Sequence, residues 1–299
     1  MHSYLQAIGF RRIKKTSQLN KLFESVTASP DNVKTIPVDD ETTYTVISKE
    51  VADGVGLSIC GELNQHNEFQ MEYYYPYLLG NTVSTNEECD IKREIEKEAY
   101  NGICDDVRLG MNLIFFINNF ADYVKYHDIM GEWPVTREIC LSALSVSGKI
   151  LLPVYKTKNQ LEIAKRNDCD SIKLIEAARN GDTSAMESLT VKDMNTYTQV
   201  TRHLKHQDLY SIVETSFMPS GVECDQYSIL AYINSCSLSI NSLSGEEIYV
   251  MEVICNNIPL RLVINKEDLL GVPKPGFRFK GDIWLQGKGN WKNLLSVNL

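Results

Sequence analysis

The eight cysteines of this 299-residue chain never lie close together in the sequence. Neighbouring cysteines are at least twelve residues apart, so the chain has no CxxC pair and neither a zinc-ribbon nor a dithiol redox motif. The common phosphate and nucleophile motifs are absent as well. The segment SVSGK at 145–149 lacks the leading glycine of a P-loop, and neither GxGxxG nor GxSxG occurs. The sequence therefore favours a non-catalytic protein and predicts no cofactor.

Long apolar segments are also missing. The most apolar run, LIFFI at 113–117, is far shorter than the ~20 residues that cross a bilayer. The start of the chain, MHSYLQAIGFRR, lacks the ~7–15-residue apolar core of a secretory signal. Reduced thiols in a cytoplasm are the default where no export signal is found. We therefore expect a cytoplasmic protein with no membrane association.

Positive charge is scarce. The 30 Lys and Arg residues against 39 Asp and Glu give a net charge of −9, which disfavours a general nucleic-acid binder. The charge is also uneven, with +4 in residues 1–30, −12 in 31–220 and −1 in 221–299. An acidic middle and a basic stretch from Arg11 to Lys21 are compatible with a protein partner or with head-to-tail self-association.

Residues 1–156 are predicted to form an α+β domain on a mostly antiparallel sheet. A helix capped by Thr16 or Ser17 is expected, because apolar residues follow at helical spacing. The acidic segment 86–106 fits either a helix or a solvated strand, and the Ser147-Gly148 dipeptide predicts a tight turn. Alternating runs predict an antiparallel meander at 41–51, 55–63 and 68–79.

The remaining chain changes character twice. Residues 157–216 have helical composition, with a helix stop at Gly181 and a new cap at Asp182. Residues 217–299 return to strands, and their order with a short helical turn predicts a small OB-like β-barrel. We therefore expect three domains, with boundaries at about 156 and 216.

The closing stretch FKGDIWLQGKGNW, at 279–291, contains the candidate binding residues. Strand alternation places Trp284 on the polar face with Lys280, which is the arrangement that a stacking platform for single-stranded nucleic acid needs. The alternative is that Trp284 packs on the neighbouring domain while the lysines are solvated. The residues predicted for this binding face are Arg278, Lys280, Trp284, Lys288 and Trp291.

Two weaker patterns point to metal chemistry. His203 and His206 are three residues apart on an expected helix, and Asp208 could supply a third ligand. A metal-dependent hydrolase could alternatively have a site that joins Asp105, Asp106 or Asp225 to a histidine. The simpler interpretation is that the histidines are exposed and that the aspartates form caps and turns.

Four stretches together resemble a bacterial family of unknown function and of about this length. They are MHSYLQAIGF, AARNGDTSAMESLTVKDM, FMPSGVECDQYSIL and DLLGVPKPGFRFKGDIWLQG. The resemblance covers nearly the whole chain and implies a complete bacterial protein. It implies no catalytic role, because the family has no known activity.

These observations favour a non-catalytic intracellular binding or scaffold protein that acts through protein–protein contacts. Nucleic-acid or nucleotide binding around Trp284 is the first alternative, and the metal-dependent hydrolase is the second.

Overall fold

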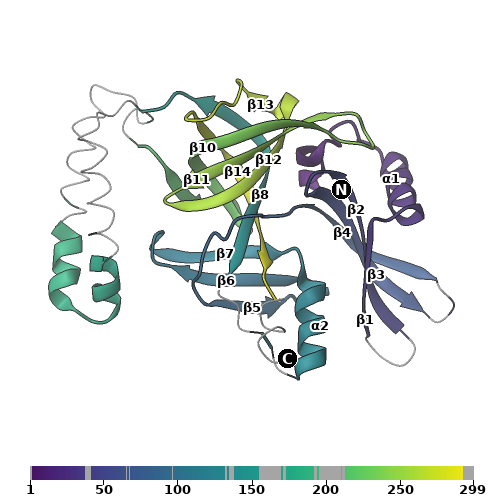
Figure 1. The fold of residues 1–299 in the computed structure, drawn as a ribbon, viewed down its shortest axis with the longest axis horizontal. Helices are drawn as coiled ribbons and strands as arrows, with labels where there is room; N and C mark the ends of the chain where they lie inside the picture. The colour runs from purple at the N-terminus through teal and green to yellow at the C-terminus, as the bar shows by residue number, and fades with distance from the viewer. Residues whose placement is uncertain are drawn as a thin grey trace.

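Strands dominate the computed structural model, which contains two sheets and few helices (Figure 1). The chain is an α+β protein, as the sequence predicts. Among the residues with a described structure, no helix is long and apolar enough to cross a membrane. The structure describes residues 2–291 apart from 38–41, 65, 67, 96, 132, 135–137, 155–169, 171–172, 192–193, 195–209 and 211–212.

The first sheet is a four-stranded antiparallel meander, which confirms the prediction for this part of the chain. The turn between its two central strands places Gly54 at φ 66, a backbone conformation that glycine adopts without strain. The first of its strands was not predicted. In sequence and spatial order they are β1 (Asn32–Pro37), β2 (Thr42–Ala52), β3 (Val55–Asn64) and β4 (Phe69–Leu78).

Two helical segments precede this sheet, namely η1 (Ser3–Ile8) and α1 (Thr16–Ala28). The second begins at Thr16, and Lys15 occupies the N-cap position in place of the predicted Thr16 or Ser17. Its buried Leu19, Leu22 and Val26 share one helical face, as an amphipathic helix requires.

The second sheet has ten strands, and three of them extend beyond its barrel. β5 (Cys89–Arg93), β6 (Tyr100–Asp106) and β7 (Met111–Ile117) pair antiparallel to one another. The ambiguous segment 86–106 therefore contains two strands. A short helix, α2 (Phe120–Met130), follows the buried strand β7.

Five strands close the barrel in the order β8-β12-β11-β10-β14, and β14 pairs back with β8. The barrel is mixed because β8 and β12 run parallel. β7 pairs in parallel with the end of β14 and so joins the extension to the barrel. The barrel strands are β8 (Ile139–Leu151), β10 (Gln226–Ile240), β11 (Glu247–Cys255), β12 (Ile258–Asn265) and β14 (Arg278–Gly289), with the short β9 (Ser216–Pro219) and β13 (Leu269–Leu270) alongside.

A five-stranded barrel in the C-terminal half is confirmed, but its prediction from 217–299 alone is wrong. β8 comes from the region assigned to the N-terminal domain, and it pairs with both β12 and β14. The turn predicted at Ser147-Gly148 is also wrong, because β8 continues through both residues. A Cβ on Gly148 would lie 2.4 Å from the Phe279 ring, so this glycine permits close packing and not a turn.

Most of the predicted helical segment, 157–216, lies outside the described residues, and the three-domain division stays a prediction. The described part is helical at 173–179 and at 183–191. Gly181 has φ 90, and Asp182 Oδ1 accepts hydrogen bonds from two backbone N–H groups of the second helix. The predicted stop and cap are therefore confirmed.

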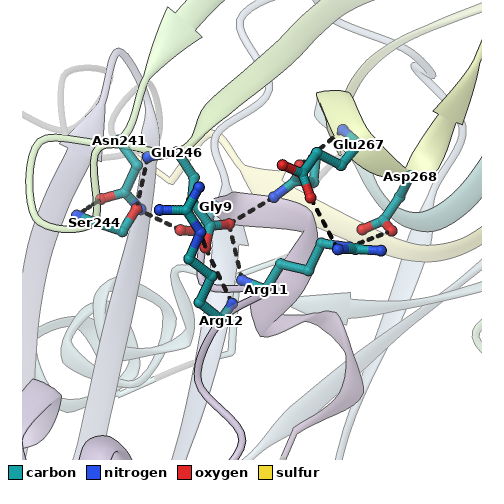
Figure 2. A network of polar contacts seen from close by, with 9 residues as sticks. Gly9, Arg11, Arg12, Asn241, Ser244, Glu246, Glu267 and Asp268 are labelled. Carbon is teal, nitrogen blue, oxygen red and sulfur yellow. Dashed lines mark hydrogen bonds and ion pairs between the residues drawn. The ribbon is translucent and has the colours of Figure 1, made fainter.

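A polar network fixes the N-terminal segment to one end of the barrel (Figure 2). The buried carboxylate of Glu246 accepts hydrogen bonds from the backbone N–H groups of Arg11 and Arg12, both at 3.0 Å. Asn265 Nδ2 donates to the same carboxylate at 2.8 Å, and Arg11 pairs with Asp268 at 2.8 Å. This network holds η1, which precedes Arg11, against the barrel.

Candidate functional site

A cleft of about 690 Å³ opens where η1, β4, β7 and β14 meet. Its floor is aromatic and consists of Tyr4, Tyr75, Phe116 and Trp284, one from each of these elements. All four side chains are buried. The volume lies within the range of ligand-binding pockets.

Trp284 packs tightly within this floor. Its ring centroid lies 4.8 Å from that of His2, 5.3 Å from Phe116 and 5.5 Å from Tyr4, and the residue is only 5% exposed. Its Nε1 donates a hydrogen bond to Asp225 Oδ2 at 2.6 Å. The predicted exposed stacking platform is therefore wrong, because stacking of a base needs an open ring face. Trp284 instead packs on His2 and Tyr4 at the start of the chain and on Phe116 of β7, while the assignment of these parts to separate domains stays a prediction.

The other four residues of the predicted binding face do not line this cleft. Arg278 is buried and donates to three backbone carbonyls at 2.7–3.0 Å. Lys280 donates to a serine hydroxyl of β10 at 2.8 Å. Lys288 and Trp291 line a different cavity. These side chains therefore do not form one exposed basic face around Trp284.

Hydrogen-bond acceptors surround the aromatic floor, and they come from Glu94, Glu223, Asp225 and Asn101. Within the described part of the chain, the buried Oδ1 of Asn101 has no hydrogen-bond partner, while its Nδ2 donates to Glu94 at 3.2 Å. The cleft has one lysine, Lys97. Its ammonium pairs with Glu94 at 3.1 Å and lies 5.2 Å from the centre of the Tyr73 ring.

Burial and charge shift several pKa values in the cleft. Burial raises the pKa of the Asp225 carboxyl, and the nearby charge of Glu223 adds to the increase. Burial, followed by the charges of the same two carboxylates, raises the pKa of Tyr4 to about 12. Burial and then the charge of Lys97 lower the pKa of His2 to about 4, so its imidazole is neutral at pH 7. A cation bound in the cleft would offset the cost of keeping Asp225 ionised.

The carboxylates predicted for a metal-dependent hydrolase have other partners. Asp105 forms an ion pair with Arg179 at 2.8 Å, and Asp106 forms one with Arg108 at 2.6 Å. Asp225 lies in the cleft and binds the indole. Among the described residues, no three His, Cys, Asp or Glu side chains gather to hold a metal ion. The other metal candidates, His203, His206 and Asp208, lie outside the described residues.

Sequence reasoning missed most of the cleft. His2 and Tyr4 reach Trp284 from the opposite end of the chain, and no local pattern indicates such a contact. Strand alternation does place Tyr73 and Tyr75 on one face, and their rings stack at 6.1 Å. The available signal was an aromatic run in one strand and an acidic loop elsewhere, which only the fold brings together.

A family model described as "Domain of unknown function, E. rectale Gene description (DUF3881)" matches residues 5–287. The chain belongs to this family. The resemblance inferred from the sequence is therefore confirmed. No curated protein and no solved structure matches the chain. The DUF3881 match includes Asp225 and Trp284, so the central pair of the cleft lies within the family's domain.

Proposed function

We propose that this DUF3881 protein binds a protein partner by receiving an arginine side chain in the cleft at Trp284. The lining of the cleft carries this proposal. Buried aromatic rings form its floor, while Glu94, Glu223, Asp225 and Asn101 supply acceptors at its sides. A ligand that fits this lining has a flat face, a positive charge and several hydrogen-bond donors.

The guanidinium group of arginine has all three properties. It is planar and always charged, and its five N–H donors match carboxylate geometry. A cation over an aromatic face gains about 0.5–2 kcal/mol, and the gain increases as water is excluded. The ammonium of Lys97 over the Tyr73 ring is an example of this attraction within the chain itself. An ammonium has only three donors, so arginine uses the acceptors of the cleft more fully.

The surroundings of the cleft support a protein as the source of this arginine. Val222, on the cleft lining, is fully exposed, and Met218 nearby in sequence is about half exposed. Exposed apolar side chains beside a polar pocket are typical of protein contacts. The −12 charge of 31–220 would attract a basic partner. Self-association through the basic N-terminal stretch has less support, because Arg11 already pairs with Asp268 in the same chain.

A nucleic acid fits the cleft less well. Its phosphates would face the carboxylates of Glu223 and Asp225. The bases would find Trp284 covered by the chain's own rings. The acidic cleft therefore favours the basic protein partner over this alternative.

Calorimetric titration with capped arginine tests the proposal. N-acetyl-arginine amide should bind with a dissociation constant in the ~mM range, which is about −4 kcal/mol. N-acetyl-citrulline amide has the same shape and a neutral urea group. Its affinity should be lower than that of the arginine ligand by a factor of about ten or more. Asp225→Asn and Glu223→Gln should each weaken arginine binding about tenfold.

A matched carboxylate change controls for the loss of net charge. Glu187 is exposed in the helix at 183–191, so Glu187→Gln should leave arginine binding unchanged. Equal affinity for the arginine and citrulline ligands would refute the proposal. Unchanged binding in both cleft variants would do the same.

A further inference from the structure

A second cavity, of about 420 Å³, lies between the first sheet and the start of α2. Val46 of β2, Tyr77 of β4, Phe120 of α2 and Trp291 contribute to its lining. Tyr75 is the one lining residue that it shares with the arginine cleft among the described residues. The two sites are therefore adjacent but separate.

Two buried polar atoms in this lining have no hydrogen-bond partner among the described residues. They are Oδ1 of Asn118, a residue 9% exposed, and Nε1 of Trp291, a residue 3% exposed. The amide nitrogen of Asn118 is satisfied by the Leu78 carbonyl at 3.1 Å, so its oxygen alone is left. Unpaired buried polar atoms are rare in folded proteins. The residues of the lining thus include one unused acceptor and one unused donor.

The start of α2 adds further donors. Asn119 occupies the N-cap position, but its side chain makes no cap. The Asn119 Nδ2 instead donates to the carbonyl of Gly289 in β14 at 2.9 Å, and its Oδ1 accepts from the Gly289 N–H at 3.0 Å. Phe120 and Ala121, in the first turn, line the cavity. First-turn N–H groups have no partner within their own helix, so they can serve a ligand here.

The charges around the cavity compensate one another. Two ion pairs border it, Lys34–Asp122 at 2.8 Å and Lys49–Asp31 at 3.7 Å. The two other charged lining residues, Glu50 and Lys288, have opposite signs. An ionic ligand would upset this balance, and a pure hydrocarbon would leave both buried polar atoms unpaired. A neutral molecule with a donor and an acceptor satisfies both conditions.

We propose that this cavity binds a small, planar, neutral molecule of the carboxamide class. Its N–H group would donate to Asn118 Oδ1, and its carbonyl would accept from Trp291 Nε1. The body of the molecule would pack on Phe120 and Trp291. This site is independent of the proposed arginine cleft, so either can fail without the other.

Benzamide is a suitable probe for the full-length chain in a ¹H–¹⁵N NMR titration. The indole signal of Trp291 and the backbone amide of Ala121 should shift and saturate, while the indole of the half-exposed Trp133 should not move. Acetophenone has the same ring and carbonyl but no donor, and benzoate carries a negative charge. The affinity of each should be lower than that of benzamide by a factor of about five or more, since each lacks one matched interaction.

Trp291→Phe keeps an aromatic ring and removes the donor. Benzamide binding, followed at Ala121, should weaken about fivefold in this variant and stay unchanged in Trp133→Phe. Three results would overturn the proposal: no saturable shift at millimolar benzamide, equal affinities for benzamide and acetophenone, or unchanged affinity in Trp291→Phe. Long-lived water at the Trp291 indole without benzamide binding would also overturn it, because water would then satisfy the unpaired atoms.

Discussion

At the scale of single residues, Asp225 and Trp284 act as a pair. The indole N–H donates to one carboxylate oxygen at 2.6 Å, and a hydrogen bond to an ionised acceptor is stronger than one between neutral groups. This bond fixes the carboxylate in the cleft and leaves its second oxygen for a ligand. Because burial raises the pKa of Asp225, keeping it ionised costs free energy in the empty cleft. A bound guanidinium would recover part of that cost.

His2, on the lining of the cleft, makes the stability of the folded chain depend on pH. Burial lowers its pKa from 6.5 to about 4, so the unfolded chain takes up a proton at higher pH than the folded chain. The stabilisation from neutral His2 is complete above pH 6.5 and is lost as the pH falls toward 4. The loss from this group is about 3 kcal/mol or less.

Urea unfolding of wild type and His2→Gln at pH 7 and pH 4.5 would measure this effect. The free energy of unfolding should fall less on acidification in His2→Gln than in wild type. His66→Gln is the control, since His66 is exposed in the β3–β4 hairpin. The free energy of unfolding of this variant should depend on pH as that of wild type does. Identical pH dependence in wild type and His2→Gln would contradict the effect.

At the scale of the elements, β14 shows how far sequence patterns reach. Alternation correctly predicts that Phe279, Ile283 and Leu285 face the core, and all three are buried. It wrongly predicts that Trp284 and Gln286 are exposed, whereas both are buried as well. Local patterning assumes solvent on the second face of a strand, whereas rings from η1, β4 and β7 cover this one.

The close packing of β8 and β14 also depends on a glycine, Gly148. A Cβ at position 148 would lie 2.4 Å from the Phe279 ring, well inside normal contact distance. We expect Gly148→Ala to lower the free energy of unfolding by about 1–3 kcal/mol through overpacking. A smaller side chain at 279 should relieve the clash, so Gly148→Ala with Phe279→Leu should cost less than the sum of the single changes. Strict additivity in a double-mutant cycle would show that the ring is not the cause.

The attachment of the N-terminal segment to the barrel depends on Glu246. This buried carboxylate accepts from two backbone N–H groups and from Asn265, and Glu246→Ala would leave these donors unpaired. We expect a loss of about 2–4 kcal/mol in the free energy of unfolding. Glu247→Ala is the neighbouring control. It breaks a half-exposed ion pair with Lys266 and should lower the free energy of unfolding much less than Glu246→Ala. Equal losses in the two variants would contradict the proposed role of the network.

At the scale of the whole molecule, both candidate sites lie where distant parts of the chain meet. The arginine cleft combines η1, the first sheet, the β5–β7 extension and β14. The carboxamide cavity combines the first sheet, α2 and the end of β14. Most of the strands could be predicted because each has its own pattern. The sites could not, since they depend on how β8 and β14 join the two halves of the chain.

The central claim is that the cleft at Trp284 binds a cationic side chain, and the three tryptophans allow a direct test. A ¹H–¹⁵N NMR titration with N-acetyl-arginine amide resolves one indole signal for each. We expect the Trp284 indole to shift and saturate, because it donates to the carboxylate that the guanidinium would approach. The Trp133 signal should stay in place, and N-acetyl-citrulline amide should have little effect. An unmoved Trp284 signal, or equal shifts with both ligands, would contradict the claim.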